Sequence, residues 1–376
     1  MGMKVDKSKW EKKTLGDLCT AGSSNIVVSK TQIGVGEYPL FGASGKVGNI
    51  DFYHNTEDYL GLVKDGSGVG RIDKYPAYSS LVGTMQYLYP TELANIDYLK
   101  YLISYLNLAK YVKGAAIPHI YYRHYKNEQI RVPNLLEQQS IASELDAIQS
   151  MIDGYKAQLE DLDELAKSIF LDMFGDPVEN PKGWEKRELG GICEVTSSKR
   201  IYQSEQTKWG VPFYRIGDFT KLIKDGISNP ELFISIEKYN ALKNAGLVPS
   251  KGDILLTSRG TLGLSYIVNE NDRFYFQDGM ITWLKNINKD ILSSFIGFIF
   301  KASLCEEQIK KMKNGSTVAY LSISMIKAFK IIVPPIILQQ QFAAKIEAIE
   351  SQKEKYKAQL LDGEQLMAER MQYYFS

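Results

Sequence analysis

The chain contains one sequence pattern twice. The first copy runs IRVPNLLEQQSIASELDAIQSMIDGYKAQL over residues 130–159, and the second runs IIVPPIILQQQFAAKIEAIESQKEKYKAQL over residues 331–360. Val-Pro, Gln-Gln, Ala-Ile and Tyr-Lys-Ala-Gln-Leu recur at a constant offset of 201 residues (331 minus 130), without a gap. Self-similarity at a fixed offset is the mark of an internal repeat. We therefore infer a tandem duplication.

The repeat extends beyond these two stretches. Residues 114–120 align with 315–321 at the same offset, whereas Trp10–Cys19 resembles Trp184–Cys193 at an offset of 174. The second copy is therefore 27 residues longer (201 minus 174), and the extra residues lie between these landmarks. Matching ends indicate a shared scaffold, and divergent middles indicate two different surfaces.

Each copy ends in a segment with the spacing of a long amphipathic helix. In the first segment, apolar residues recur at alternating steps of four and three, which is the heptad pattern of a coiled-coil seam. Asn134 is a candidate N-cap, and Gly175 followed by Pro177 is a candidate stop. The first stripe comprises Ile141, Leu145, Ile148, Ile152, Tyr155, Leu159, Leu162, Ala166, Ile169 and Met173. The second comprises Phe342, Ile346, Ile349, Tyr356, Leu360, Met367 and Tyr374.

Neither helix can bury its stripe alone, so the two are expected to pair. Two stripes in matching register within one chain favour an antiparallel intrachain pair, which would place the globular modules at opposite ends. A dimerisation coiled coil between two chains is the alternative. Lys353, Gly363 and Arg370 interrupt the second stripe, which predicts a looser pairing at those positions.

These patterns divide the chain into four segments. They are a first module over 1–133, a helix over 134–175, a second module over 176–333 and a helix over 334–376. The whole chain carries a formal net charge of +1, but the modules carry +4 and +5 and the helices −7 and −1. Excess positive charge on the modules suits contact with phosphates, although ordinary scatter could give a similar imbalance.

Each module mixes short β-like runs with glycine-containing turns and one helical segment, at 98–111 and 294–311. This composition predicts an α+β fold with a mainly antiparallel sheet. The glycine spacing fits neither a dinucleotide-binding nor a P-loop motif. A tight β-turn that presents polar side chains is the preferred interpretation. The candidate DNA-binding residues of these turns are Lys64, Ser67, Arg71, Arg259 and Thr261.

A second candidate surface lies at residues 118–126, where the sequence PHIYYRHYK interleaves aromatic and cationic side chains. Such a mixture suits stacking on bases and contact with phosphates. A β-strand with alternating buried aromatics is an equally good interpretation. The candidate DNA-binding residues here are His119, Tyr121 and Arg123, with Lys313, Ser316 and Thr317 in the corresponding loop of the second copy.

No catalytic or metal-binding motif emerges. Cys19, Cys193 and Cys305 are far apart, no CxxC or HExxH occurs, and neither a methyltransferase motif nor a nuclease motif is recognisable. The absence of an apolar run of 18 residues predicts no transmembrane helix. The polar N-terminus excludes a secretory signal, and the sparse cysteines favour a reducing, cytoplasmic compartment.

The layout resembles the specificity subunits of type I restriction-modification systems. The resemblance rests on the Trp-Glu…Leu-Gly openings at Trp10 and Trp184, on the stretches 114–120 and 315–321, and on the Val-Pro…Gln-Gln helix entries. It covers essentially the whole chain. It implies two pseudo-symmetric target-recognition domains, separated by two long antiparallel coiled-coil helices that act as spacers.

The resemblance also implies a function. Each module would read one half of a bipartite site in double-stranded DNA, and the helices would set the spacing and dock two methyltransferase subunits. A separate restriction subunit would cleave DNA. The chain itself would be non-catalytic and without a cofactor, since S-adenosylmethionine and ATP would bind only to partner subunits.

Two other classes of function remain open at this stage. The chain could be a scaffold whose rod holds two protein- or glycan-binding lobes, or an enzyme whose active site has no recognisable motif. A DNA reader would lose affinity steeply as salt is raised, because bound counterions are released from DNA. A scaffold would not.

Overall fold

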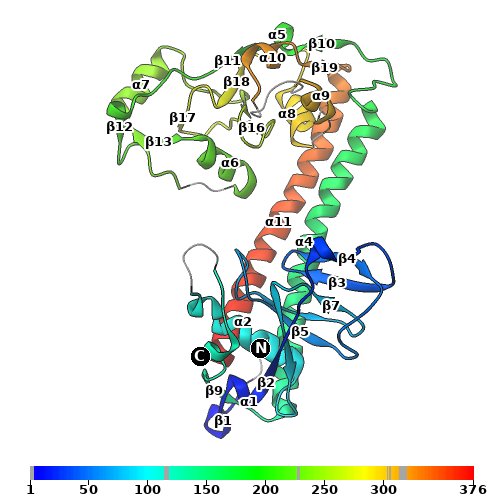
Figure 1. Ribbon diagram of the computed structural model, residues 1–376. Helices are drawn as coiled ribbons and strands as arrows, with labels where there is room; N and C mark the ends of the chain where they lie inside the picture. The colour runs from blue at the N-terminus through cyan, green and yellow to red at the C-terminus, as the bar shows by residue number, and fades with distance from the viewer. Residues whose placement is uncertain (1–3, 114–117, 227–228, 303, 305, 313–319) are drawn as a thin grey trace. The chain divides into compact units, whose positions relative to one another are not determined.

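A computed structural model describes residues 4–113, 118–226, 229–302, 304, 306–312 and 320–376 (Figure 1). The chain forms two compact units. Unit 1 comprises Met1–Ala157 together with Tyr356–Ser376, and unit 2 comprises Gln158–Lys355. Each long helix is therefore divided near its middle, and half of it belongs to each unit. Among the described residues, every helix is too short or too polar to cross a bilayer.

Unit 1 contains a two-stranded ladder and two sheets. The larger sheet is antiparallel throughout, with strand order β2-β8-β5-β6, and the smaller has order β4-β3-β7 with a parallel β3–β7 pair. The strands are β1 (Glu11–Thr14), β2 (Cys19–Ser23), β3 (Tyr38–Gly42), β4 (Gly45–Ile50), β5 (Tyr59–Val63), β6 (Ile72–Tyr75), β7 (Ser80–Leu81), β8 (Met85–Pro90) and β9 (Gln129–Val132). The helices of this module are α1 (Leu15–Leu18), α2 (Ile96–Leu106) and α3 (Tyr122–Tyr125).

Unit 2 repeats this plan. The sheet that corresponds to the larger sheet of unit 1 has order β11-β18-β15-β16, and the other, which also has four strands, has order β12-β14-β13-β17 with a parallel β13–β17 pair. The strands are β10 (Lys186–Glu188), β11 (Glu194–Thr196), β12 (Gln206–Thr207), β13 (Val211–Tyr214), β14 (Phe233–Ile234), β15 (Ile254–Thr257), β16 (Ser265–Ile267), β17 (Tyr275–Phe276), β18 (Ile281–Lys285) and β19 (Lys330–Ile332). The helices are α5 (Leu189–Ile192), α6 (Ile216–Asp225), α7 (Ile236–Asn244), α8 (Ser293–Lys301), α9 (Glu306–Met312) and α10 (Ile323–Lys327).

Equivalent hydrogen bonds in the two units confirm the internal repeat. The ladder β1–β9 in unit 1 corresponds to β10–β19 in unit 2. The backbone N–H of Leu15 donates to the Glu128 carbonyl at 3.0 Å, and that of Leu189 donates to the Phe329 carbonyl at 2.9 Å. These partners lie at the two offsets found in the sequence. The module fold is α+β and mainly antiparallel, as the sequence predicted.

The two units differ most in one connecting segment, the excursion, which leads from β3 to β5 in unit 1 and from β13 to β15 in unit 2. In unit 1 the chain goes from β3 to β5 through residues 43–58, which include strand β4. In unit 2 it goes from β13 to β15 through residues 215–253, which form α6, β14 and α7. Most of the length added to the second copy lies in this excursion.

The helical segments predicted within the modules need correction. The segment 98–111 is two helices and not one, because Asn107 adopts a left-handed conformation (φ 47°) that ends α2 at Leu106, and a 3-10 helix follows over Leu108–Tyr111. The segment 294–311 is not one helix, since α8 ends at Lys301 and α9 begins at Glu306.

Helices α4 (Leu135–Phe174) and α11 (Ile336–Phe375) follow the two ladders. Helix α4 begins where the sequence predicted, since the Asn134 side chain accepts a hydrogen bond from the backbone N–H of Glu137 at 3.0 Å. It ends at Gly175, whose φ of 75° favours glycine. The predicted cap and stop are both confirmed.

Within unit 1, the first half of α4 pairs antiparallel with the last half of α11. Glu144 contacts Arg370, Ile152 faces Gly363, and the rings of Tyr155 and Tyr356 lie 6.2 Å apart. The seam residues buried in unit 1 are Ile141, Leu145, Ile148, Ile152, Met367 and Tyr374, while Tyr155, Tyr356 and Leu360 are half-buried. One continuous apolar core joins this seam to α2 and the larger sheet.

Unit 2 shows the same antiparallel arrangement for the remaining halves. Asp163 pairs with Lys353, and Phe170 lies 5.5 Å from Phe342, centroid to centroid. Of the predicted seam residues in unit 2, Ala166, Phe342 and Ile349 are buried, and Leu159, Leu162, Ile169, Met173 and Ile346 are half-buried. In both units the pairing is intrachain, as predicted.

Each of the three residues that interrupt the second stripe packs against a residue of α4. Lys353 is only 6% exposed and donates to Asp163 Oδ1 at 2.6 Å. Arg370 Nε donates to Glu144 Oε1 at 2.7 Å. Gly363 makes room for Ile152, since an added Cβ would lie 3.1 Å from Ile152 Cγ1. The expected loosening at these positions is therefore wrong, because each has a specific partner on α4.

One glutamine in each unit ties the start of the long helix to its module. Gln138 Nε2 donates to the carbonyls of Leu93 and Pro133, and its Oε1 accepts from the backbone N–H of Asn95 at 2.8 Å. Gln339 repeats this pattern in unit 2, with the carbonyls of Asp290 and Pro334 and the N–H of Leu292. Both side chains are at most 1% exposed, so the Gln-Gln motif of the repeat has a structural role.

Replacement of Gln138 by alanine should destabilise unit 1 by roughly 2–4 kcal/mol, because it leaves buried backbone groups without partners. Equilibrium urea denaturation measures this loss. The control is Gln139→Ala in the same helical turn, which alters an exposed side chain and should change stability little. Equal stability of the two variants would contradict a stabilising role for the hydrogen bonds of Gln138.

The Lys353–Asp163 pair gives a second test. Asp163→Ala should destabilise unit 2 by about 1–3 kcal/mol, because among the described residues the largely buried Lys353 ammonium then keeps one carboxylate, that of Glu350, at 3.8 Å. Lys353→Met should be neutral or stabilising, since an apolar side chain restores the stripe. The double variant should match Lys353→Met in denaturation experiments. If Asp163→Ala is as harmful in the Lys353→Met background as alone, the proposed coupling is absent.

Candidate nucleic-acid interface

In unit 1, the structure brings together the two segments that the sequence singled out separately. Asp65 and His119 form an isolated antiparallel bridge. The backbone N–H of Gly66 donates to the Pro118 carbonyl, and that of Ile120 donates to the Lys64 carbonyl, both at 3.0 Å. The glycine turn after β5 and the stretch 118–126 therefore share one surface.

An exposed aromatic–cationic stack forms part of this surface. The Tyr121 ring lies 4.0 Å from the His119 ring, centroid to centroid, and the Arg123 guanidinium lies 4.8 Å from the Tyr121 centroid. Tyr121 is 44% exposed, and Arg123 is exposed as well. A flat ring beside a cation at the surface can stack on a base or approach a phosphate.

The alternative interpretation of this stretch as a β-strand is wrong. Residues Tyr122–Tyr125 form the short helix α3. Tyr125 is nevertheless fully buried, and the half-buried Tyr122 donates through its hydroxyl to the Cys19 carbonyl at 2.5 Å. The stretch therefore combines aromatics that anchor it in the core with others that remain at the surface.

Local charge at this surface is positive. Burial and the nearby Lys64 lower the pKa of His119. Desolvation lowers the pKa of His124, and the neighbouring Lys113 and Arg123 lower it further. These shifts show that three cationic side chains act on the two imidazoles.

The glycine turn is a tight turn, as predicted. Gly66 and Gly70 have φ values of 89° and 91°, which favour glycine. Arg71 folds back over Gly68, and its Nη2 donates to the Ala43 carbonyl at 3.0 Å. Ser67 is exposed within the turn. Arg71 is thus held against the turn by backbone carbonyls, whereas Arg123 is stacked on an exposed ring.

Unit 2 has an equivalent surface. Arg259 and Tyr320 form an isolated antiparallel bridge, and the backbone N–H of Leu321 donates to the Ser258 carbonyl at 3.0 Å. The Arg259 guanidinium lies 4.8 Å from the Tyr320 ring centroid and is exposed. Tyr320 stands 201 residues after His119, so the Arg259–Tyr320 and Asp65–His119 bridges occupy the same place in the repeat. We name these two places the two-loop sites.

Of the remaining predicted residues of unit 2, the structure describes one, Thr261. Thr261 is exposed in the turn after β15, and its carbonyl accepts a hydrogen bond from the Thr257 hydroxyl. Lys313, Ser316 and Thr317 lie outside the described residues.

Sequence reasoning missed Tyr320, although the alignment of 114–120 with 315–321 contained the signal. It also missed two strongly exposed aromatics of unit 2, Tyr202 (64%) and Trp209 (72%). They lie next to exposed cations in the sequences Lys199-Arg200-Ile201-Tyr202 and Lys208-Trp209. This interleaving is the same signal that marked residues 118–126.

Cys19 and Cys193 are the cysteines that the structure describes, and both are buried. Burial raises the pKa of both Cys19 and Cys193 to about 12, so neither thiol is reactive near neutral pH. Within the described residues there is no group of three or more His, Cys, Asp or Glu side chains that could hold a metal ion.

Sequence comparison finds known proteins that are similar to this chain. A putative type I restriction enzyme specificity subunit of Haemophilus influenzae is 23% identical over 345 residues, which cover 84% of this chain and 81% of that protein. The MjaVIII specificity subunit of Methanocaldococcus jannaschii is 23% identical over 325 residues, which cover 81% and 75% of the two chains.

Solved structures share the fold. The S subunit of a type I restriction-modification system from M. genitalium matches with a TM-score of 0.63 and 17% identity, over 100% of this chain and 98% of that one. A chain from a structure of type I restriction-modification complex assembly and conformational transition matches with a TM-score of 0.52 and 14% identity, over 96% of both chains.

The sequence profile of the type I restriction modification DNA specificity domain matches twice, over residues 7–163 and 181–362. Each match begins before the ladder of one repeat and ends within the long helix that follows it. The two matches together cover most of the chain. The chain therefore belongs to the type I restriction-modification specificity subunit family, with two specificity domains.

Proposed function

We propose that this chain reads the two halves of a bipartite site in double-stranded DNA, one half with each module. The observation that carries this proposal is the repeated two-loop site. Each unit brings a glycine turn and a second loop together and exposes a cation stacked on a tyrosine, Arg123 on Tyr121 and Arg259 on Tyr320. The backbone bridges are equivalent in the repeat, whereas the stacks are not, since Tyr121 and Arg123 align with Ser322 and Ser324. Two similarly placed cationic surfaces suit a ligand that offers two similar contact points.

The two-loop sites would contact the DNA backbone rather than bases. They belong to the part of the module that both repeats share, and phosphate contacts carry no sequence information. The excursions, residues 43–58 and 215–253, differ between the repeats and would read bases. Helix α6 supports this assignment, because Gly217, Lys221 and Lys224 are exposed along it, and a helix fits the major groove.

Helices α4 and α11 would set the spacing between the half-sites and dock two methyltransferase subunits. Each helix runs for 40 residues without a break, which corresponds to roughly 60 Å. The acidic character of α4 makes it a poor DNA surface, which favours contact with protein. The chain would lack catalytic activity, and S-adenosylmethionine and ATP would bind only to methyltransferase and restriction subunits.

Removal of either stacked cation tests the two-loop sites. Arg123→Ala and Arg259→Ala should each weaken binding to duplex DNA and lower the slope of log affinity against log salt by about one, as loss of one phosphate contact requires. Titrations at several salt concentrations, with the methyltransferase subunits present, measure both quantities.

The control for these titrations is Lys345→Ala, which removes an exposed cation from α11 and should leave the slope unchanged. An unaltered slope for both arginine variants would remove the two-loop sites from the interface. If the DNA affinity of the unmodified chain does not depend on salt concentration, a protein-binding scaffold would be favoured instead.

A matched insertion tests the spacer. One heptad is added to α4 after Ala157 and one to α11 after Lys355, so that the seam stays in register. The helices grow by about 10 Å, and the tolerated gap should lengthen by about three base pairs at 3.4 Å each. Both half-site sequences should stay the same in methylated-site sequencing. Altered half-site sequences with an unchanged gap would contradict the role of the two helices as a spacer.

A further inference from the structure

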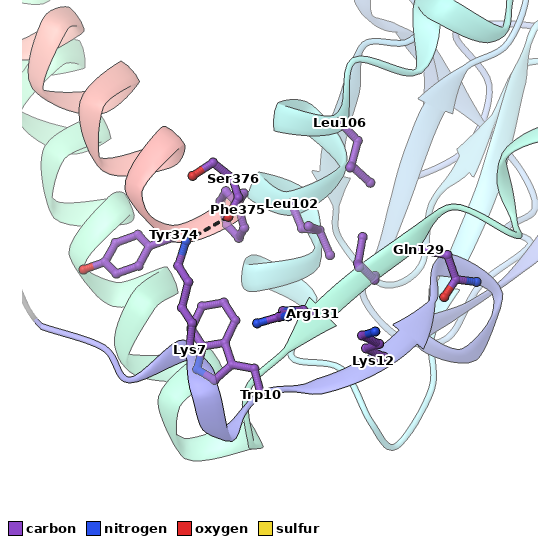
Figure 2. A pocket seen from close by; sticks show the side chains of 11 residues that line it. Lys7, Trp10, Lys12, Leu102, Leu106, Gln129, Arg131, Tyr374, Phe375 and Ser376 are labelled. Carbon is purple, nitrogen blue, oxygen red and sulfur yellow. Dashed lines mark hydrogen bonds between the residues drawn. The ribbon is translucent and has the colours of Figure 1, made fainter.

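One tryptophan of unit 2 differs from the other three tryptophans of the chain. Trp10 is 7% exposed and lines a cavity of unit 1 (Figure 2), and its indole N–H donates to Glu137 Oε1 at 3.2 Å. The indole N–H groups of Trp184 and Trp283 also donate, to a carbonyl at 2.8 Å and to a carboxylate at 2.9 Å. Trp209 is 72% exposed, and its indole N–H makes no hydrogen bond to any residue that the structure describes.

The loop that carries Trp209 has a well-defined backbone. It consists of residues 208–210 and joins β12 to β13, which pair with the two sides of β14. The Thr207 hydroxyl donates to the Trp209 carbonyl at 2.7 Å. Gly210 has a φ of 129° and packs closely against β14, since an added Cβ would clash with the Ile234 carbonyl oxygen. The backbone therefore holds Trp209 at this place on the surface.

The segment around Trp209 is positively charged. Residues 199–224 contain six Lys and Arg residues and two Asp and Glu residues, a net charge of +4 (six minus two). Lys208, the neighbour of Trp209, is exposed, and so is Lys199; neither makes an ion pair with another described residue. Phosphates are attracted to such cations, and an aromatic ring beside them can stack on a base. The segment therefore suits a nucleic acid better than a protein.

The corresponding segment of unit 1 lacks this feature. It consists of residues 24–37, which lead from β2 to β3 as residues 197–210 lead from β11 to β13. It contains one Lys, one Glu and no aromatic residue. Its exposed large apolar side chains are those of Val27, Val28 and Val35. An aromatic contact with DNA at this place would therefore occur in one half-site only.

Along the chain, Trp209 lies close to the helix that would enter the major groove. Strand β13, Val211–Tyr214, separates the loop 208–210 from α6, and four residues of strand span about 13 Å. One turn of DNA spans about 34–36 Å. Helix α6 and Trp209 can therefore contact the same turn of one duplex.

We propose that Trp209 inserts between two neighbouring base pairs of the half-site that the second module reads. This inference rests on the proposed function, because it requires that the second module binds duplex DNA. In a duplex each base is covered by its neighbours, so a ring can stack on a base only by opening that base step, which kinks the duplex. Lys208 would meet an adjacent phosphate and offset part of the cost of unstacking. The kink would occur at one half-site, since residues 24–37 offer no equivalent ring.

Measurement of DNA bending tests the inserted ring. A duplex that contains the bipartite site, found by sequencing of methylated positions, carries one fluorophore at each end. Energy transfer between the fluorophores is measured with the chain and its methyltransferase subunits bound at saturation. It should be lower with Trp209→Ala than with the unmodified chain, because the kink is lost. Trp209→Phe, which keeps an aromatic ring, should retain most of the energy transfer.

The affinity for the same duplex gives a second measurement. Trp209→Ala should weaken binding about tenfold or more, because a base contact is lost. The slope of log affinity against log salt should stay unchanged, since stacking releases no counterions. The matched control is Val35→Ala, which shortens an exposed apolar side chain in the corresponding segment of unit 1 and should change neither bending nor affinity.

Equal energy transfer with and without Trp209→Ala would overturn the inserted ring, whatever the affinity, and would leave the proposed function intact. Loss of methyltransferase binding by Trp209→Ala in sedimentation experiments without DNA would overturn it as well, because Trp209 would then lie in a protein interface. If the unmodified chain with its methyltransferase subunits binds no duplex, the proposed function is contradicted, and the inserted ring with it.

Discussion

The antiparallel pairing of α4 with α11 is the constraint on which both units depend. Each helix carries an apolar stripe that it cannot bury alone, and each unit covers half of both stripes. The pairing is specific rather than only apolar, because Lys353 and Arg370 reach Asp163 and Glu144 across the seam. A slip of one heptad would separate these charges and place Gly363 away from Ile152, so the polar contacts fix the register.

The repeat makes the two units alike where they are fixed to the helices and different in residues 43–58 and 215–253. Gln138 and Gln339 brace the helix starts with the same set of hydrogen bonds. Both excursions contain one strand that pairs antiparallel with the preceding strand, β4 with β3 and β14 with β13, but that of unit 2 is longer and adds the helices α6 and α7. The excursions can therefore vary in sequence without disturbing these hydrogen bonds or the seam between α4 and α11.

The sequence was sufficient for features that depend on local periodicity, and insufficient for those that depend on tertiary contacts. The heptad stripe, the Asn134 cap and the Gly175 stop could be predicted because spacing and caps act within one segment. The Asp65–His119 and Arg259–Tyr320 bridges join residues far apart in sequence, so no local pattern marks them. The looseness predicted at Lys353 was wrong because a heptad count ignores the reach of a long side chain to Asp163.

The central claim is that two modules read two DNA segments at a fixed separation. Sequencing of methylated positions in DNA from cells that carry this chain with its partner subunits tests it most directly. The account predicts one motif made of two specific halves with a constant gap of unspecified bases, absent when the chain is deleted. A single uninterrupted motif, or two halves at variable separation, would contradict it.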